Sequence, residues 1–221
     1  MRHVYIAFVL LISCNSNSPK NHISQVDSST NNQTSTVDTI PKSNNIWVDR
    51  LNGSTYPLPD TIDGKPISFY LDNPKVADIS KALYKAKFRP TDNDSTTQLL
   101  SYVTTKDSTL RPFYRWCLDF TITISDGALA EYPGVPALAY ATEFPKEFFD
   151  YMNKDQSGQR YKQWTEIIAY SGLSNYGRKE SEIENEIISN MRNNCYICVG
   201  NTKSRIVTFA RDVVKAIKLQ D

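Results

Sequence analysis

Residues 125–152 read SDGALAEYPGVPALAYATEFPKEFFDYM, the densest run of small and aromatic residues in the chain. Recognisable helical patterns lie on both sides, so we place this stretch at the centre of a small helical domain. Pro133, Pro136 and Pro145 divide it, because proline lacks a backbone donor and clashes with the preceding turn inside a helix. Asp126 is a candidate cap for the first segment. The short helices expected here cover residues 127–132, 137–143 and 146–153.

The chain after this stretch keeps the helical spacing of apolar residues. Tyr161, Trp164 and Ile168 share one face, and Gly172 is placed as a helix C-terminal glycine. Four glutamates between residues 180 and 186 favour a helix start, where the helix dipole is positive. The helices expected in this half cover residues 159–171, 180–191 and 203–219.

The chain before the stretch is less regular. Prolines and glycines between residues 46 and 72 break any long element, so we expect an irregular arm over residues 46–72. Within it, residues 67–71 read as a short strand or a packed extended segment. We expect Trp47, Tyr56 and Phe69 to anchor this arm on the helices.

Helices are expected between the arm and residue 125. Asn73 and Pro74 suit the N-cap and first position of a helix that extends to Ala86. A second helix follows the polar residues 91–94, and a third is expected over residues 110–124, although its β-branched end could also form a strand.

The fold expected from about eight helices is an all-α, compact multi-helix domain over residues 73–221. Successive helix pairs could stack in a HEAT-like manner or close into a globular bundle. The sequence contains no internal repeat, so the HEAT-like stack is suggested by the spacing of the helices alone.

The N-terminus carries a short apolar run, residues 4–13, behind Arg2 and His3. Ten apolar residues are too few for a membrane-spanning helix, which needs about 20, and the pattern is typical of an export signal. Residues 11–14, Leu-Ile-Ser-Cys, resemble the lipobox of bacterial lipoproteins. That resemblance implies removal of residues 1–13 and acylation of Cys14. An ordinary secretory signal with an incidental cysteine is the alternative.

Residues 14–45 are rich in Ser, Asn and Thr and contain no aromatic residue, so we expect a disordered tether. No acidic residue follows Cys14 directly, and such acids direct some lipoproteins of Bacteroidota-type bacteria to the cell surface. The resemblance therefore implies an outer-membrane lipoprotein that faces the periplasm. The motifs LRPFYRW (residues 110–116) and SDGALAEYPG (residues 125–134) also resemble uncharacterised lipoproteins of these bacteria, which implies no particular activity.

Histidine is absent from residues 45–221, since His3 and His22 are the only two in the sequence. A Ser-His-Asp triad or a Cys-His pair needs an imidazole beside the nucleophile, so these sites and histidine-bound zinc are excluded there. Cys195 and Cys198 have C-x-x-C spacing, and a local disulfide is the favoured interpretation. Redox catalysis, or a metal site with Cys117 as a third ligand, remains as an alternative, and we expect no cofactor.

Carboxylates are the remaining candidates for catalysis. Asp119, Asp126, Glu131 and Glu143 lie near the centre of the sequence and could supply a glycosidase-type pair. The structural alternative makes Asp126 a helix cap and pairs Asp119 with Arg111 or Arg115. Five aromatic residues could similarly line a binding groove or simply fill the core: Tyr114, Trp116, Tyr132, Tyr140 and Trp164.

The favoured function is a lipid-anchored, non-catalytic module that binds an envelope protein and contacts the membrane through its anchor. The formal net charge of +1 and the lack of a long basic stripe argue against nucleic acid as a partner. One alternative is a hydrolase of envelope polymers that uses Asp126 or Glu131. A narrower form of the favoured function is an immunity-type lipoprotein that binds a toxin.

Overall fold

The computed structural model describes residues 45–173, 178–196, 198 and 200–220. The chain divides after Ile40, and its second unit is Pro41–Asp221. The predicted signal peptide, Cys14 and all but the last residue of the predicted tether lie outside the described residues. Every described residue belongs to the second unit.

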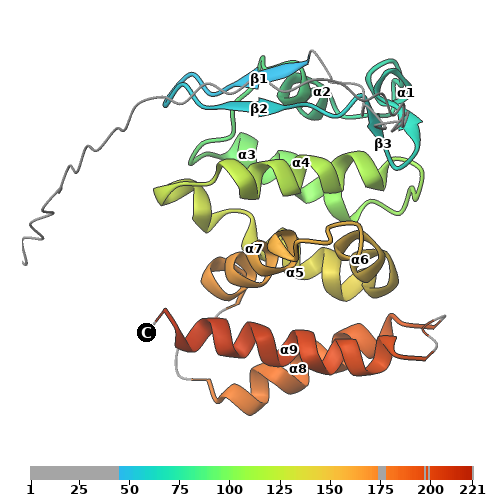
Figure 1. Ribbon diagram of the computed structural model, residues 1–221, viewed down its shortest axis with the longest axis vertical. Coiled ribbons are helices and arrows are strands. Elements are labelled where there is room, and N and C mark those ends of the chain that lie inside the picture. Colours follow the sequence, from blue (N-terminus) through green and yellow to red (C-terminus); the bar gives the residue numbers. More distant parts are fainter. Residues whose placement is uncertain (1–44, 174–177, 197, 199, 221) are drawn as a thin grey trace, which may run out of the picture. The chain divides into compact units, whose positions relative to one another are not determined.

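Two small antiparallel hairpins open the second unit (Figure 1). The pairs are β1 (Ile46–Val48) with β2 (Thr55–Pro57) and β3 (Thr61–Ile62) with β4 (Lys65–Pro66). Asp63 and Gly64 form the second turn with φ values of 52° and 76°, the left-handed conformation that an Asp-Gly pair adopts readily. Trp47 is buried, and its indole N–H donates to the carbonyl of Leu83 at 3.1 Å. This contact fixes the first hairpin to the helices.

Helices make up most of the remaining described residues. In chain order the α-helices are α1 (Ile67–Leu71), α2 (Asp78–Tyr84), α3 (Asp94–Ser101), α4 (Arg111–Ile124), α5 (Gly134–Glu143), α6 (Pro145–Met152), α7 (Gln159–Ile167), α8 (Glu180–Asn193) and α9 (Thr202–Lys218). Three shorter turns are η1 (Tyr102–Thr104), η2 (Gly127–Glu131) and the π-helical η3 (Ile168–Gly172). This arrangement confirms the predicted multi-helix fold with an irregular region before it.

Helix α4 lies in the middle of the unit (Figure 1). It separates the layer of the hairpins, α1 and α2 from the layer of α5, α6 and α7. Most of its side chains are buried, because it packs against elements on opposite sides. Pro112 lies in its first turn, as the sequence predicts. Its C-terminal residues continue the helix instead of forming a strand, since Phe120, Thr121 and Ile122 are all buried.

Two predictions for the arm and the first helix are wrong. Residues 67–71 form α1, because the hydroxyl of Tyr70 donates to the carbonyl of Ile62 at 3.1 Å and its ring stacks on Phe113 at 5.1 Å. The helix expected from Asn73 begins only at Asp78. The Asn73 side chain accepts the Lys75 N–H at 2.9 Å and closes a turn there, which ends before the helix begins.

Three smaller expectations also fail. Asp126 makes no capping hydrogen bond to η2, which is a short 3-10 turn, and its carboxylate lies 4.0 Å from Arg89. Helix α5 begins at Gly134, ahead of Pro136, because proline is tolerated in the first turn of a helix. Phe69 does not anchor the arm; it is 38% exposed, and the adjacent Tyr70 is buried in its place.

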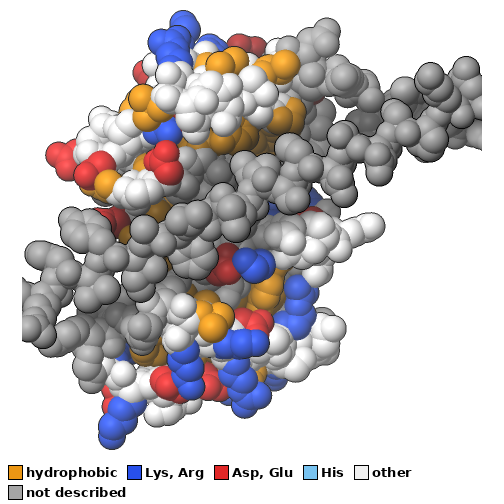
Figure 2. Space-filling view, turned by 60° about the vertical axis from the view of Figure 1, so that its left-hand side comes forward, with side chains coloured by type: hydrophobic (Ala, Val, Ile, Leu, Met, Phe, Trp, Pro, Cys, Tyr) orange, Lys and Arg blue, Asp and Glu red, His pale blue; other side chains and the backbone are white. Residues whose placement is uncertain are grey.

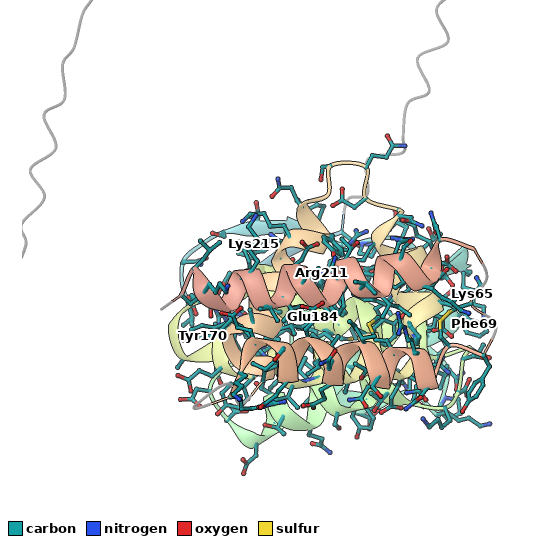
Figure 3. The ribbon with its side chains drawn as sticks, turned by 90° about the horizontal axis from the view of Figure 1, so that it is seen from below. Lys65, Phe69, Tyr170, Glu184, Arg211 and Lys215 are labelled. Atoms are coloured by element: carbon teal, nitrogen blue, oxygen red, sulfur yellow. A yellow bond between two sulfur atoms is a disulfide. The ribbon has the colours of Figure 1, made fainter. Side chains whose placement is uncertain are left out.

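Helices α8 and α9 pair at the end of the unit remote from the hairpins. Figure 3, which views the unit from this end, shows the two helices side by side. Arg211 of α9 forms an ion pair with Glu184 of α8 at 3.1 Å. Lys218 and Glu180 form a second bridge at 2.8 Å. The outer side of this helix pair is polar. The buried apolar residues of both helices face the rest of the unit: Ile183, Ile187, Met191, Ile206, Phe209 and Val213.

Candidate binding site

A pocket of about 450 Å³ lies between the α3–η1 segment and the η2–α5 segment. Its apolar surface comes from Leu100 and Val103 on one side and from Val135, Pro136 and Ala139 on the other. Val135 is 60% exposed at the rim of this pocket. The remaining lining residues are polar or aromatic: Thr97, Ser101, Thr104, Glu131 and Tyr132.

The position of α5 follows from two glycines. A Cβ atom on Gly134 would lie 2.3 Å from the backbone nitrogen of Gly172, so only glycine permits this approach of α5 to η3. The hydroxyl of Ser171 donates to the carbonyl of Ala130 at 2.8 Å and accepts the Gly134 N–H at 3.2 Å. These bonds fix the start of α5 and leave Val135 on the pocket side.

Acidic groups gather at one end of this pocket. The hydroxyl of Tyr132 donates to the carboxylate of Asp92. This bond raises the pKa of Tyr132 above its usual range, and the negative charges of Asp92, Asp94 and Glu131 add to the effect. Within the described residues, none of these three carboxylates forms an ion pair with a lysine or arginine. We call the three carboxylates the acidic rim.

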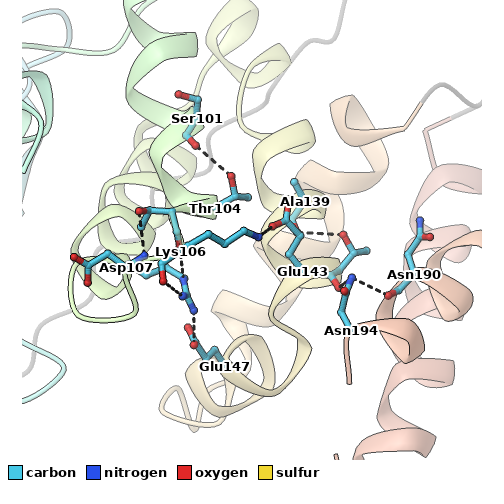
Figure 4. A network of polar contacts seen from close by, with 12 residues as sticks. Ser101, Thr104, Lys106, Asp107, Ala139, Glu143, Glu147, Asn190 and Asn194 are labelled. Atoms are coloured by element: carbon cyan, nitrogen blue, oxygen red, sulfur yellow. Dashed lines mark hydrogen bonds and ion pairs between the residues drawn. The ribbon is translucent and has the colours of Figure 1, made fainter. Parts of the chain in front are cut away.

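A network of polar contacts borders the other end of the pocket (Figure 4). Lys106 bridges to Glu143 at 2.7 Å, and Arg111 bridges to Glu147 at 2.5 Å. The guanidinium of Arg111 is buried, donates to the carbonyl of Thr105 at 2.9 Å and lies 3.7 Å from the Phe144 ring centroid. The loop before α4 is therefore held to the α5–α6 junction, which keeps the pocket walls together.

A second, smaller pocket of about 260 Å³ lies beyond this network. Glu143, one helical turn after Ala139, lines it together with the α5–α6 junction and the loop after α8. In that loop Cys195 and Cys198 are joined by a disulfide. Tyr196, between the two cysteines, is 91% exposed. Helix α5 therefore runs along two neighbouring pockets.

The third cysteine of the described residues, Cys117, lies apart from this loop in the core. It is a free thiol on α4, and burial raises its pKa well above the ordinary value. Within residues 45–220 as described, no group of three or more His, Cys, Asp or Glu side chains is placed to hold a metal ion.

The four central carboxylates have separate surroundings. Asp119 accepts the Trp164 indole N–H at 2.6 Å and the Tyr151 hydroxyl at 2.7 Å, and Arg160 lies at 3.4 Å. Its predicted pairing with Arg111 or Arg115 is wrong, because Arg111 bridges Glu147, and Arg115 faces Asp63 at 3.8 Å and Tyr140 at 3.1 Å.

The side chain of Asp126 is largely exposed beside Arg89, and Glu143 is bound to Lys106. Glu131 is thus the only one of the four that lines the larger pocket, although Glu143 lines the smaller one.

Most of the predicted groove aromatics fill the core instead. Tyr114, Tyr140 and Trp164 are buried, and Trp116 stacks between Phe113 and Phe120 with centroid distances of 5.8 and 5.4 Å. Tyr132 lines the larger pocket. Nothing in the residue pattern distinguished Tyr132 from the others, since its exposure depends on the turn η2.

The surface beyond these pockets carries mixed charge. On the face drawn in Figure 2, Lys and Arg side chains gather over α8 and α9 with acidic side chains between them. No helix among the described residues is long and apolar enough to cross a membrane. Comparisons with protein-family models, curated proteins and solved structures found no match to this chain.

Proposed function

We propose that this protein is a lipid-anchored protein of the cell envelope whose helical unit binds a partner protein and does not act as an enzyme. The observation that carries the binding role is the apolar pocket along α5, with Val135 exposed at its rim and the acidic rim at its end. Exposed apolar surface bordered by polar groups is typical of protein-interaction sites.

The anchoring part of the proposal comes from the sequence. The lipobox-like residues 11–14 and the polar residues 14–45 support acylation at Cys14 and a tether that holds the unit away from the headgroups. Stable anchoring needs more than one acyl chain, and a mature bacterial lipoprotein carries several. The outer membrane, facing the periplasm, is the proposed location.

We further interpret the helices as a HEAT-like stack closed by α8 and α9. Support comes from the layered order of α4, α5–α7 and α8–α9, and from the polar outer side of the last pair. Terminal elements of a helical stack need such a polar face for solubility. In such a stack, grooves between layers are ordinary binding surfaces.

The hydrolase alternative has weaker support. Asp126 and Glu131 would have to converge on one bond, but Asp126 lies beside Arg89 and does not line the pocket that holds Glu131. An enzyme of this kind would lose its activity in Glu131→Gln, whereas a binding module has no turnover to lose.

The test is site-specific photo-crosslinking of the full chain in intact cells. A photoreactive residue at Val135 should capture one partner, and the same residue at Tyr170, which is 51% exposed beside a different pocket, should not. The partner identified by mass spectrometry should then bind the purified protein. Turnover of an envelope polymer by the purified protein, with no partner captured at Val135, would reject the binding role. Cys14→Ala should release the protein from membranes, and continued membrane association would reject the anchor.

A further inference from the structure

We infer that the pocket along α5 takes an apolar side chain from a lysine- or arginine-rich segment of the partner protein. This inference deepens the proposed function and rests on it, since it names the chemistry of the partner at the same site.

The apolar part of the partner follows from the pocket walls. Leu100, Val103 and Pro136 give the pocket an apolar interior, and its volume of about 450 Å³ lies within the range of ligand pockets. The exposed Val135 loses its contact with water only when a second apolar group covers it. A Leu, Ile or Phe side chain of the partner supplies such an apolar group.

The positive charge of the partner follows from the acidic rim. Glu131 lines the pocket beside Tyr132, and the Tyr132 hydroxyl donates to the carboxylate of Asp92. Asp94 begins α3, the helix that forms the opposite wall, and none of the three carboxylates forms an ion pair with a described lysine or arginine. Lys106, in the polar network described above, is already paired with Glu143. The described groups around the pocket therefore carry a negative balance that cations of a partner would offset.

The hydroxyls of the opposite wall match the same partner. Ser101 donates its hydroxyl proton to the carbonyl of Gln98 at 2.8 Å, and Thr104 donates to the carbonyl of Ser101 at 3.4 Å. Both residues line the pocket, and each hydroxyl oxygen keeps its capacity to accept a hydrogen bond. Ammonium, guanidinium and backbone N–H groups are donors, so a cationic segment would satisfy these acceptors.

The same charges disfavour two other occupants. Anionic lipid headgroups and nucleic acid both present phosphates, which the acidic rim repels. A second copy of this chain would have to present a basic apolar segment. The described part of α9 has lysines on its exposed side, but its apolar residues are buried. A separate protein partner is therefore the occupant to test.

The experiment measures binding of labelled synthetic peptides to the full chain, purified in non-ionic detergent, by fluorescence anisotropy. The probe peptide alternates leucine and lysine. One control peptide has glutamate in place of each lysine, and another has serine in place of each leucine. We expect binding of the probe alone, with an affinity that falls as salt rises.

Matched variants locate the site. Val135→Arg should weaken probe binding by more than about tenfold, since it places a cation against the cationic peptide. Glu131→Gln should weaken it by about 1.5- to 5-fold, the range for one exposed charge pair. Tyr170→Arg and Glu166→Gln make the same changes at a pocket of about 430 Å³ near η3 and should have no effect.

Two results would overturn the inference: equal binding of the glutamate peptide, or no binding of the probe. Equal loss in Tyr170→Arg and Val135→Arg would place the binding elsewhere and overturn it as well. The photo-crosslinking test is independent of the peptides. A partner captured at Val135 that lacks a basic apolar segment would leave the binding function standing and remove only this inference.

Discussion

The close approach of α5 to η3 makes Gly134 the position where one added methyl group should matter most. In Gly134→Ala the new Cβ would lie 2.3 Å from the nitrogen of Gly172, 2.4 Å from the hydroxyl oxygen of Ser171 and 2.5 Å from its carbonyl carbon. Optimal contacts between such atoms are about 3.5–4 Å. Either α5 or η3 must therefore move by about 1 Å.

The expected cost follows from the nature of these neighbours. Overpacking a filled interior costs about 1–3 kcal/mol, and two of the three atoms belong to the backbone and cannot rotate away, so about 3 kcal/mol applies here. Alanine recovers at most about 1 kcal/mol through its higher helix propensity. The net loss of unfolding free energy should be about 2 kcal/mol, which lowers Tm by about 4–8 °C in a domain of this size.

Urea and thermal unfolding followed by circular dichroism measure this loss. Val135→Ala is the matched control, because Val135 is the next residue and is exposed, and it should change stability by less than about 0.5 kcal/mol. Gly172→Ala acts on the same contact from the other side, where its Cβ would lie 2.7 Å from the Gly134 carbonyl oxygen. The double variant should therefore lose less than the sum of the two. A Gly134→Ala variant as stable as Val135→Ala would refute the close approach.

Three further measurements test the buried polar groups. Arg89 donates hydrogen bonds to Asp49 and lowers the pKa of its carboxyl group. The contribution of this ion pair to the free energy of unfolding is full above about pH 4 and is lost as pH falls through the lowered pKa. Asp49→Asn should therefore cost about 1.5–3 kcal/mol in urea unfolding at neutral pH and less in acid. Burial raises the pKa of Tyr140 to about 12, so as pH rises this phenol ionises in the unfolded chain before it ionises in the folded protein. The free energy of unfolding should therefore fall from about pH 10 upward, and it should fall less steeply with pH in Tyr140→Phe. Alkylation followed by mass spectrometry should modify Cys117 only after denaturation, and Cys195 and Cys198 only after reduction; modification of the pair without reductant would contradict the disulfide.

Elements with a long apolar period could be predicted from the sequence. Helices α4, α8 and α9 follow their expected ranges closely because each has a wide apolar face over at least three turns. Proline marked the starts of α4 and α6, since it fits the first turn of a helix. Residues 125–152 also lie where expected, between α4 and α7.

Short elements could not be predicted, because five residues carry too little pattern. The run at residues 67–71 forms a helix only because Tyr70 packs on Phe113, which lies more than 40 residues later in the chain. The pocket along α5 escaped prediction for a related reason. Its walls come from α3, η1, η2 and α5, and the exposure of Val135 depends on a glycine contact that no local spacing reveals.

The first hairpin has a mechanical consequence. Any tension on the chain ahead of residue 45 reaches β1 before it reaches a helix. Several contacts of that segment resist it, among them the Trp47 indole bond to Leu83, the packing of Trp47 on Phe120 and the bidentate Asp49–Arg89 bridge. If these contacts give way, the segment through β2 separates from the helices, and none of the residues that line the pocket along α5 belongs to it. Roughly fourteen released residues would add about 45 Å of reach at about 3.3 Å per residue. A pulled molecule could thus extend toward a distant partner with its pocket intact.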